Sequence, residues 1–195
     1  IQSISMVISS FCTICLLFLQ EDFVRVWLGE EYVLDTLVLV AIVVNLYFTI
    51  ALYPLRVYRD ATGLYQKTKI IMLMTVVVNI FLSILLGKKI GLAGILFATS
   101  ISRVVTYFWY EPIVLFKEHF DKSSLYYFGE IGKSILVICF ISAIEHFVCE
   151  FITVTGWLTL ILKGCVVGGI AFIGVFAVYR KSAGVKMLLS LNFCK

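Results

Sequence analysis

The sequence predicts an all-α integral membrane protein with six transmembrane helices. Hydrophobic residues make up 62% of the 195 residues, and charged residues make up only 14%. Soluble domains carry about 25% charged residues, and the mean hydropathy of this chain is +1.05. Apolar runs that are long enough to cross a bilayer alternate with short polar segments. These observations exclude a soluble domain with a large core.

The first apolar run covers 4–19 and is short for a membrane span. The chain opens with Ile1, inside an apolar stretch, and no charged segment or cleavage site of a signal peptide precedes that stretch. We therefore expect the chain to be incomplete at its N-terminus, with the beginning of the first helix missing.

Five further spans follow, and together with the first they form one expected lobe over 1–179. A basic tail with interspersed leucines, 180–195, is expected to form a short helix at the cytoplasmic membrane surface. The five spans are expected over 34–55, 70–86, 91–116, 134–153 and 157–179.

Basic residues are distributed unequally between the two sides that six spans define. Three lie on one side: Arg25, Lys88 and Lys89. Eleven lie on the other: Arg56, Arg59, Lys67, Lys69, Lys117, Lys122, Lys133, Arg180, Lys181, Lys186 and Lys195. Because lysine and arginine accumulate in cytoplasmic loops, we expect both ends of the chain to be cytoplasmic.

Two charged residues are expected near the middle of the membrane. Arg103 lies twelve residues from the outer end of its span, and Glu145 lies twelve residues from Lys133 at the inner end of its own span. At 1.5 Å per residue both depths are about 18 Å. A charge there is expensive and is by default a candidate for function. Arg103 and Glu145 are therefore predicted to pair, and either to line a transport path for an anion or to fix helix packing.

Other polar residues in the spans have less decisive patterns. His146 adjoins Glu145 and could relay protons, although a lone histidine is more often simply hydrogen-bonded. Glu150 and Lys163 flank a tight turn and are predicted to form a second, mainly structural pair. Asn79 and Ser83 lie one turn apart and are predicted to form hydrogen bonds between helices.

The sequence predicts neither a metal site nor an enzyme. Cys12 and Cys15 have CxxC spacing, but no second pair and no nearby histidine accompany them, so they are interpreted as small buried hydrophobes. No nucleotide-binding loop and no nucleophile–base pair of recognisable spacing occur. No catalytic residue, cofactor or nucleic-acid partner is therefore expected.

Several segments, taken together in order, resemble the C-terminal half of the oligosaccharide-lipid flippases, which belong to the superfamily that includes the MATE exporters. The similarity is best over 21–116. It is carried by Phe23-Val-Arg-Val-Trp-Leu-Gly-Glu-Glu-Tyr32, Pro54, Tyr58-Arg-Asp-Ala-Thr-Gly-Leu-Tyr-Gln-Lys-Thr-Lys69, Asn79-Ile-Phe-Leu-Ser83, Gly91-Leu-Ala-Gly94 and Thr99-Ser-Ile-Ser102.

The resemblance implies a transporter of two six-helix lobes around a central cationic cavity, with this chain as the second lobe. It implies a flippase of the bacterial cytoplasmic membrane that moves undecaprenyl-diphosphate-linked oligosaccharides to the outer leaflet, for O-antigen or capsule synthesis. Partners would be the lipid-linked oligosaccharide, membrane lipid and membrane proteins of polysaccharide assembly. Arg103 is compatible with a diphosphate headgroup.

Three alternatives remain open. A MATE-type exporter of small molecules would share the fold but not the patterns over 23–32 and 54–69. An oligosaccharide-lipid polymerase would be expected to carry a large external loop, whereas the external loops here are short. A membrane scaffold would have no need of a charge at the position of Arg103.

Overall fold

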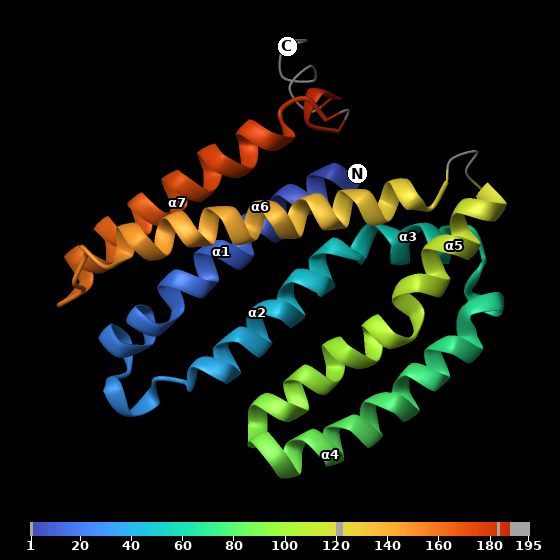
Figure 1. Cartoon of the computed structure of the whole chain (residues 1–195), viewed down its shortest axis with the longest axis horizontal. Coiled ribbons are helices and arrows are strands. Elements are labelled where there is room, and N and C mark those ends of the chain that lie inside the picture. Colours follow the sequence, from blue (N-terminus) through green and yellow to red (C-terminus); the bar gives the residue numbers. More distant parts are fainter. Residues whose placement is uncertain (1, 120–122, 183, 188–195) are drawn as a thin grey trace. The chain divides into compact units, whose positions relative to one another are not determined.

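The computed structural model describes residues 2–119, 123–182 and 184–187, and no strand occurs in these ranges. Residues 184–187 are also helical, and the rest of the expected tail helix, 188–195, lies outside the described residues. The elements are α1 (Gln2–Trp27), the 3₁₀ helix η1 (Glu30–Tyr32), α2 (Thr36–Ala51), α3 (Tyr53–Ala61), α4 (Tyr65–Val105), α5 (Tyr107–His119), α6 (Leu125–Cys149) and α7 (Trp157–Tyr179) (Figure 1).

The chain divides into two compact units. Unit 1 contains Ile1–Asp35 and Ile131–Lys195, and unit 2 is the continuous segment Thr36–Glu130. Helices α2 to α5 lie in unit 2, while α1, α7 and most of α6 lie in unit 1.

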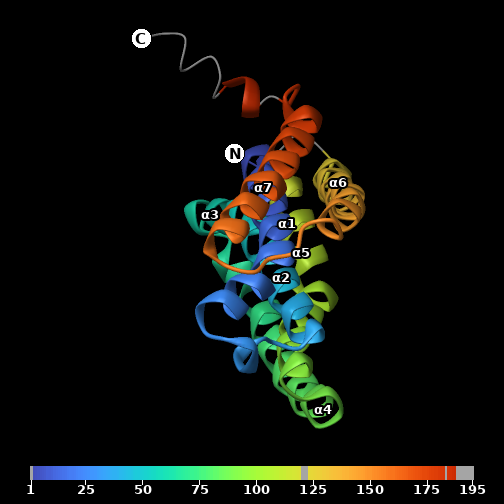
Figure 2. The same cartoon turned by 90° about the vertical axis from the view of Figure 1, so that its left-hand side faces the viewer.

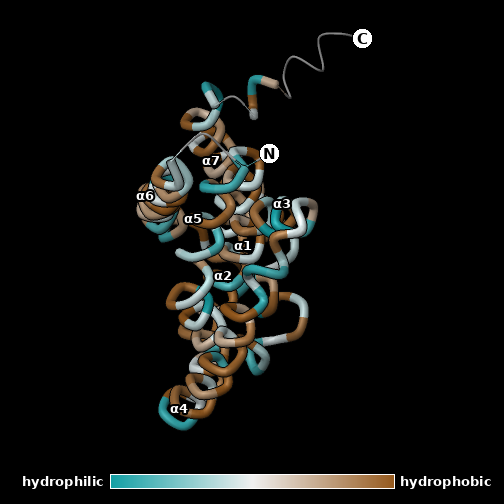
Figure 3. The backbone as a smooth tube through the Cα atoms, turned by 90° about the vertical axis from the view of Figure 1, so that its right-hand side faces the viewer, coloured by the Kyte–Doolittle hydropathy of each residue, from teal (hydrophilic) through white to brown (hydrophobic). Residues whose placement is uncertain are grey.

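Among the described residues, five helices are long and apolar enough to cross a membrane, as in a multi-pass membrane protein. They are Gln2–Trp27, Thr36–Ala61, Tyr65–His119, Leu125–Cys149 and Trp157–Tyr179. Figure 3 shows long apolar stretches along the helices, separated by hydrophilic ones. The count differs from the six predicted spans because the predicted spans 70–86 and 91–116 both lie in the third of these segments, which is 55 residues long.

That long segment reverses its direction at Ile90 and Gly91. Ile90 has φ −128° and ψ 21°, and Gly91 has φ 60° and ψ −138°, so neither is helical. Gly91 suits the reversal because residues with a side chain rarely adopt positive φ. In Figure 1, α4 accordingly runs out to a tip and returns beside itself. We call this element the α4 hairpin, with a first arm, 65–89, and a second arm, 92–105.

A close approach of the two arms depends on Gly94. A Cβ atom added to Gly94 would collide with the backbone carbonyl of Leu86, on the first arm. No real Cβ comes so close to a backbone oxygen, so a side chain at this position would force the arms apart. The two arms can therefore lie this close together at the tip of the hairpin only because residue 94 has no side chain.

Polar contacts join the α4 hairpin internally and to α2. The hydroxyls of Thr75 and Thr106 lie 2.6 Å apart. Asn45 on α2 donates to the carbonyl oxygen of Leu96 at 2.8 Å and accepts a hydrogen bond from Ser100 at 2.9 Å. Such bonds matter between apolar helices because hydrophobic burial hardly distinguishes a neighbouring helix from lipid.

In unit 1, α1 and α7 pack together, and α6 lies to one side of them (Figure 2). The hydroxyls of Ser10 on α1 and Ser134 on α6 lie 2.9 Å apart, and the Lys133 ammonium lies 4.8 Å from the centre of the Tyr179 ring. The first helix continues to Trp27, eight residues beyond the end of the apolar run 4–19.

Candidate functional site

The main candidate site is a groove along the α4 hairpin that contains Arg103. Its volume is about 250 Å³. It is lined by Met72, Thr75, Val76 and Asn79 of the first arm, by Thr99, Ser102 and Arg103 of the second arm, and by Tyr107 at the start of α5. The groove therefore combines apolar side chains, uncharged hydrogen-bonding groups and a single cation.

Arg103 has no acidic partner among the residues of unit 2 that the structure describes. Its guanidinium donates one hydrogen bond, from Nη1 to the hydroxyl of Thr49 on α2, over 3.1 Å. Among the described residues of unit 2, no carboxylate lies within the 4.0 Å of an ion pair with Arg103. A guanidinium has five N–H donors, so most of its hydrogen-bonding capacity remains for another group.

Asn79 provides the uncharged polar side of the groove. Its amide nitrogen lies 3.3 Å from both the Thr99 and the Ser102 hydroxyls on the opposite arm. Ser83, one turn further along, is half-buried, and no hydrogen bond of its side chain occurs among the described residues. Asn79 thus joins the arms beside Arg103, while Ser83 lies outside the groove lining.

Glu145 is a buried carboxylate on α6. Its exposed fraction is 0%, and neither carboxylate oxygen accepts a hydrogen bond among the described residues. Glu145 belongs to unit 1 and Arg103 to unit 2. Because the units are described separately, the predicted pair of these two residues stays a prediction.

The other ionisable residues singled out in the sequence, His146, Glu150 and Lys163, line one cavity in unit 1. The cavity has a volume of about 290 Å³. It is lined by Leu17, Phe18, Glu21, Asp22, His146, Cys149, Glu150 and Lys163. Helices α1 and α7 and the end of α6 therefore bring acidic and basic groups to the same place.

The predicted pair of Glu150 and Lys163 is wrong. The Lys163 ammonium donates to Asp22 on α1, with Nζ 2.5 Å from Oδ2. Glu150 instead lies 3.8 Å from its helical neighbour His146, and both of these side chains are exposed. The physical reason is burial. Asp22 and Lys163 are both shielded from solvent, and an unpaired charge there would cost free energy. The exposed Glu150 is hydrated by water and has no such cost without a partner.

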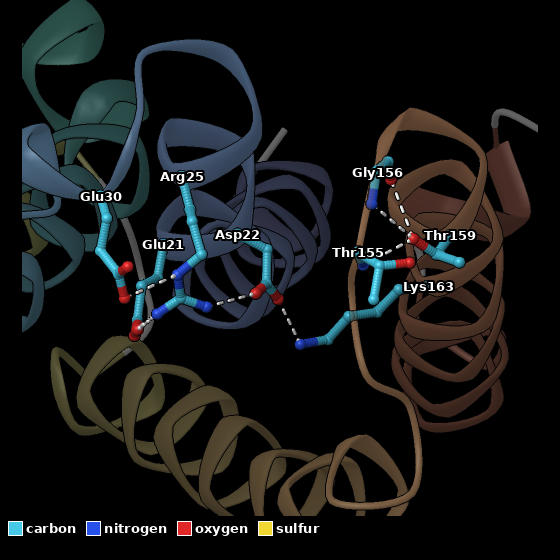
Figure 4. A network of polar contacts seen from close by, with 8 residues as sticks. All are labelled: Glu21, Asp22, Arg25, Glu30, Thr155, Gly156, Thr159 and Lys163. Carbon is cyan, nitrogen blue, oxygen red and sulfur yellow. Dashed lines mark hydrogen bonds and ion pairs between the residues drawn. The ribbon is translucent and has the colours of Figure 1, made fainter.

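Asp22 is the centre of a larger network (Figure 4). Its other oxygen accepts a hydrogen bond from Arg25 Nη1 at 3.2 Å, and Arg25 also pairs with Glu21 at 2.7 Å. The sequence carries a signal for part of this network. Charges three and four residues apart, as in Glu21, Asp22 and Arg25, support a continuing helix.

A second buried ion pair also went unpredicted. Arg59 on α3 and Glu111 on α5 lie 2.9 Å apart, and their side chains are only 8% and 2% exposed. Arg59 also pairs with the exposed Asp60 at 2.9 Å. Arg59 was expected in a cytoplasmic loop, because nothing in the local sequence pattern shows that α3 and α5 meet.

No known protein family, curated protein or solved structure matches the chain. No group of three or more potential metal ligands occurs in the described ranges. The properties of the groove are therefore inferred from its own lining residues. A guanidinium with spare donors, beside amide and hydroxyl groups, is suited to bind an anion with several oxygens.

Proposed function

We propose that this chain is the C-terminal lobe of a flippase for diphosphate-linked lipid oligosaccharides, with six spans and both ends in the cytoplasm. The observation that carries the proposal is Arg103. It is a cation in a long apolar helix that lines a groove, and no carboxylate of the described part of unit 2 pairs with it. A charge in the middle of a span costs at least about 2.5–3.5 kcal/mol. An anionic ligand would offset that cost during transport.

Six spans follow if the reversal at Gly91 turns the 55-residue segment into two membrane crossings. The first arm of the α4 hairpin then crosses the membrane once, and the second arm together with α5 crosses it a second time. The positive-inside pattern supports the proposed orientation of the ends.

The proposed activity requires no covalent chemistry. A diphosphate with attached sugars cannot cross hydrocarbon unaided, because polar and charged groups lose their hydration there. A polar path between two lobes lowers that barrier, and rocking of the lobes exposes the path to each side in turn. A guanidinium suits this substrate because it can donate two parallel hydrogen bonds to phosphate oxygens.

The direct test is the position of the lipid-linked sugars in a strain that lacks the gene. We expect single repeat units to remain on the cytoplasmic leaflet and surface polysaccharide to be lost. Units that reach the outer leaflet but never lengthen would instead indicate a polymerase. Normal surface sugars would contradict both and favour a small-molecule exporter.

Complementation of that strain tests the role of Arg103. Arg103→Gln should abolish export, and Arg103→Lys should restore part of it because the charge is kept and the two-pronged geometry is lost. Lys69→Gln is a matched control, since Lys69 is an exposed cation of the same unit outside the groove. Export by Arg103→Gln at the wild-type rate, with equal expression, would rule out the proposed site.

Glu145 is the proposed carrier of a coupling proton. It is buried in a membrane-spanning helix and accepts no hydrogen bond in the described part of the chain. Glu145→Gln should therefore uncouple transport from the proton gradient. Unchanged transport by this variant, with normal expression, would remove Glu145 from the proposal.

A further inference from the structure

We infer that the groove of the α4 hairpin holds the hydrocarbon chain next to the phosphate, so that one site binds both parts of a polyprenyl phosphate lipid. The inference rests on the proposed function and extends it, because a binding site for the phosphate alone would need only Arg103 and its polar neighbours. The groove is also lined by apolar side chains, which would not contact such an anion.

These apolar side chains lie at the surface of unit 2. Met72 and Val76 line the groove on the first arm, and Tyr107 lines it at the start of α5. Val76 is 54% exposed although it lines the groove, so the groove is open along the side of the hairpin. A hydrocarbon chain could therefore enter sideways without passing through a closed opening.

The surroundings of the open side favour a lipid over a water-soluble anion. Large apolar side chains beside the groove are exposed on both arms, namely Leu73, Val77, Ile80, Ile101 and Val105. A soluble anion gains nothing from such a surface, whereas the apolar chain of a lipid can pack against it in van der Waals contact. The cation at Arg103 supplies the complementary charge for the head of the same molecule.

The size of the groove limits what it can hold. Pockets that enclose a whole small ligand have volumes of about 300–1,000 Å³, and this groove has about 250 Å³. It therefore holds the part of the lipid around the phosphate, meaning the phosphate group and the first segment of chain. The rest of a long chain would stay in the bilayer, which is consistent with a headgroup that crosses while its chain remains in hydrocarbon.

The test compares two probes, inorganic pyrophosphate and farnesyl diphosphate, by calorimetry on the whole chain in lipid nanodiscs. We expect the wild-type chain to bind farnesyl diphosphate about tenfold tighter or better, because burial of methylene groups adds to the charge interaction. Arg103→Gln should weaken binding of both probes. Val76→Trp narrows the groove and should weaken binding of farnesyl diphosphate more than binding of pyrophosphate, so that most of the preference for farnesyl diphosphate is lost.

Val77→Trp is the matched control. Val77 is the next residue on the same arm, is 62% exposed and does not line the groove, so its replacement should leave the preference within about twofold of wild type. Met72→Trp narrows the same groove one turn away and replaces Val76→Trp if that variant is not monodisperse.

The outcomes separate the inference from the proposed function. Equal binding of the two probes by wild type, or equal effects of Val76→Trp and Val77→Trp, would overturn the chain-binding groove. If Arg103→Gln still weakened both probes in that case, the anion site of the proposed function would stand. Unchanged binding of both probes by Arg103→Gln would overturn both.

Discussion

Lys163 on α7 and Asp22 on α1 form a buried ion pair across 141 residues of sequence. Arg25 donates to the second oxygen of the same carboxylate. One acidic group thus connects the first and the last described span of unit 1. Loss of Asp22 leaves Lys163 as an uncompensated buried charge, and loss of Lys163 leaves the Asp22 carboxylate with Arg25 as its remaining partner.

Neutralising Lys163 alone should destabilise unit 1. Lys163→Met should lower the free energy of unfolding by about 3–5 kcal/mol, the usual effect of breaking a buried pair, as measured by unfolding in mixed micelles. Asp22→Asn should do the same. The exposed Lys181→Met provides the control and should have little effect.

The exchanged pair Asp22→Lys with Lys163→Asp should recover part of the lost stability, because the two charges would again face one another. Incomplete recovery is expected, since Arg25 would then adjoin a lysine. Independent, additive effects of the two single changes would show that the pair does not form.

Gly94→Ala should open the α4 hairpin. The added methyl would collide with the Leu86 carbonyl oxygen, and overpacking of this kind costs about 1–3 kcal/mol. Gly168→Ala is the matched control, because nothing lies within 4 Å of a Cβ at that helical glycine. Thermal unfolding in detergent should show a loss for the first variant only.

Glu111→Ala should destabilise unit 2 far more than Asp60→Ala, although both carboxylates pair with Arg59 at 2.9 Å. Glu111 is buried, so its loss should cost about 3–5 kcal/mol. Asp60 is 60% exposed, and an exposed partner contributes only about 0–1 kcal/mol. Similar losses of unfolding free energy for the two variants, measured with denaturant, would show that burial does not decide the contribution of each carboxylate.

The proposed orientation predicts opposite labelling of two exposed residues. In a chain whose six cysteines have been replaced, Lys88→Cys at the tip of the α4 hairpin should react with a membrane-impermeant maleimide in intact cells. Asp60→Cys should react only after the membrane is opened. External labelling of position 60 would reverse the topology.

Hydropathy alone locates the ends of some helices and misses others. The predicted span 157–179 and helix α7 share their ends, because Gly156 and Arg180 bound an apolar run. The first helix extends eight residues beyond its predicted end at 19, to Trp27. There the helix is stabilised by charge pairs within one turn, which an apolar count does not register.

The sequence pointed to Arg103 but not to the groove around it. A single charge in an apolar run is conspicuous, whereas a groove requires the two arms of the hairpin to face each other in a defined register. The partner of Lys163 was missed for a related reason. Sequence proximity favoured Glu150, and only the packing of α1 against α7 brings Asp22 to it.

The reversal at Gly91 has a consequence for how the chain enters the bilayer during synthesis. The first arm leaves the ribosome before the second, and the two are joined by only a few residues. They can thus enter together, and Asn79 on the first arm meets Thr99 and Ser102 as soon as the second arm follows. We expect membrane insertion of the Arg103 segment to depend on the arm that precedes it, so that the second arm by itself inserts poorly.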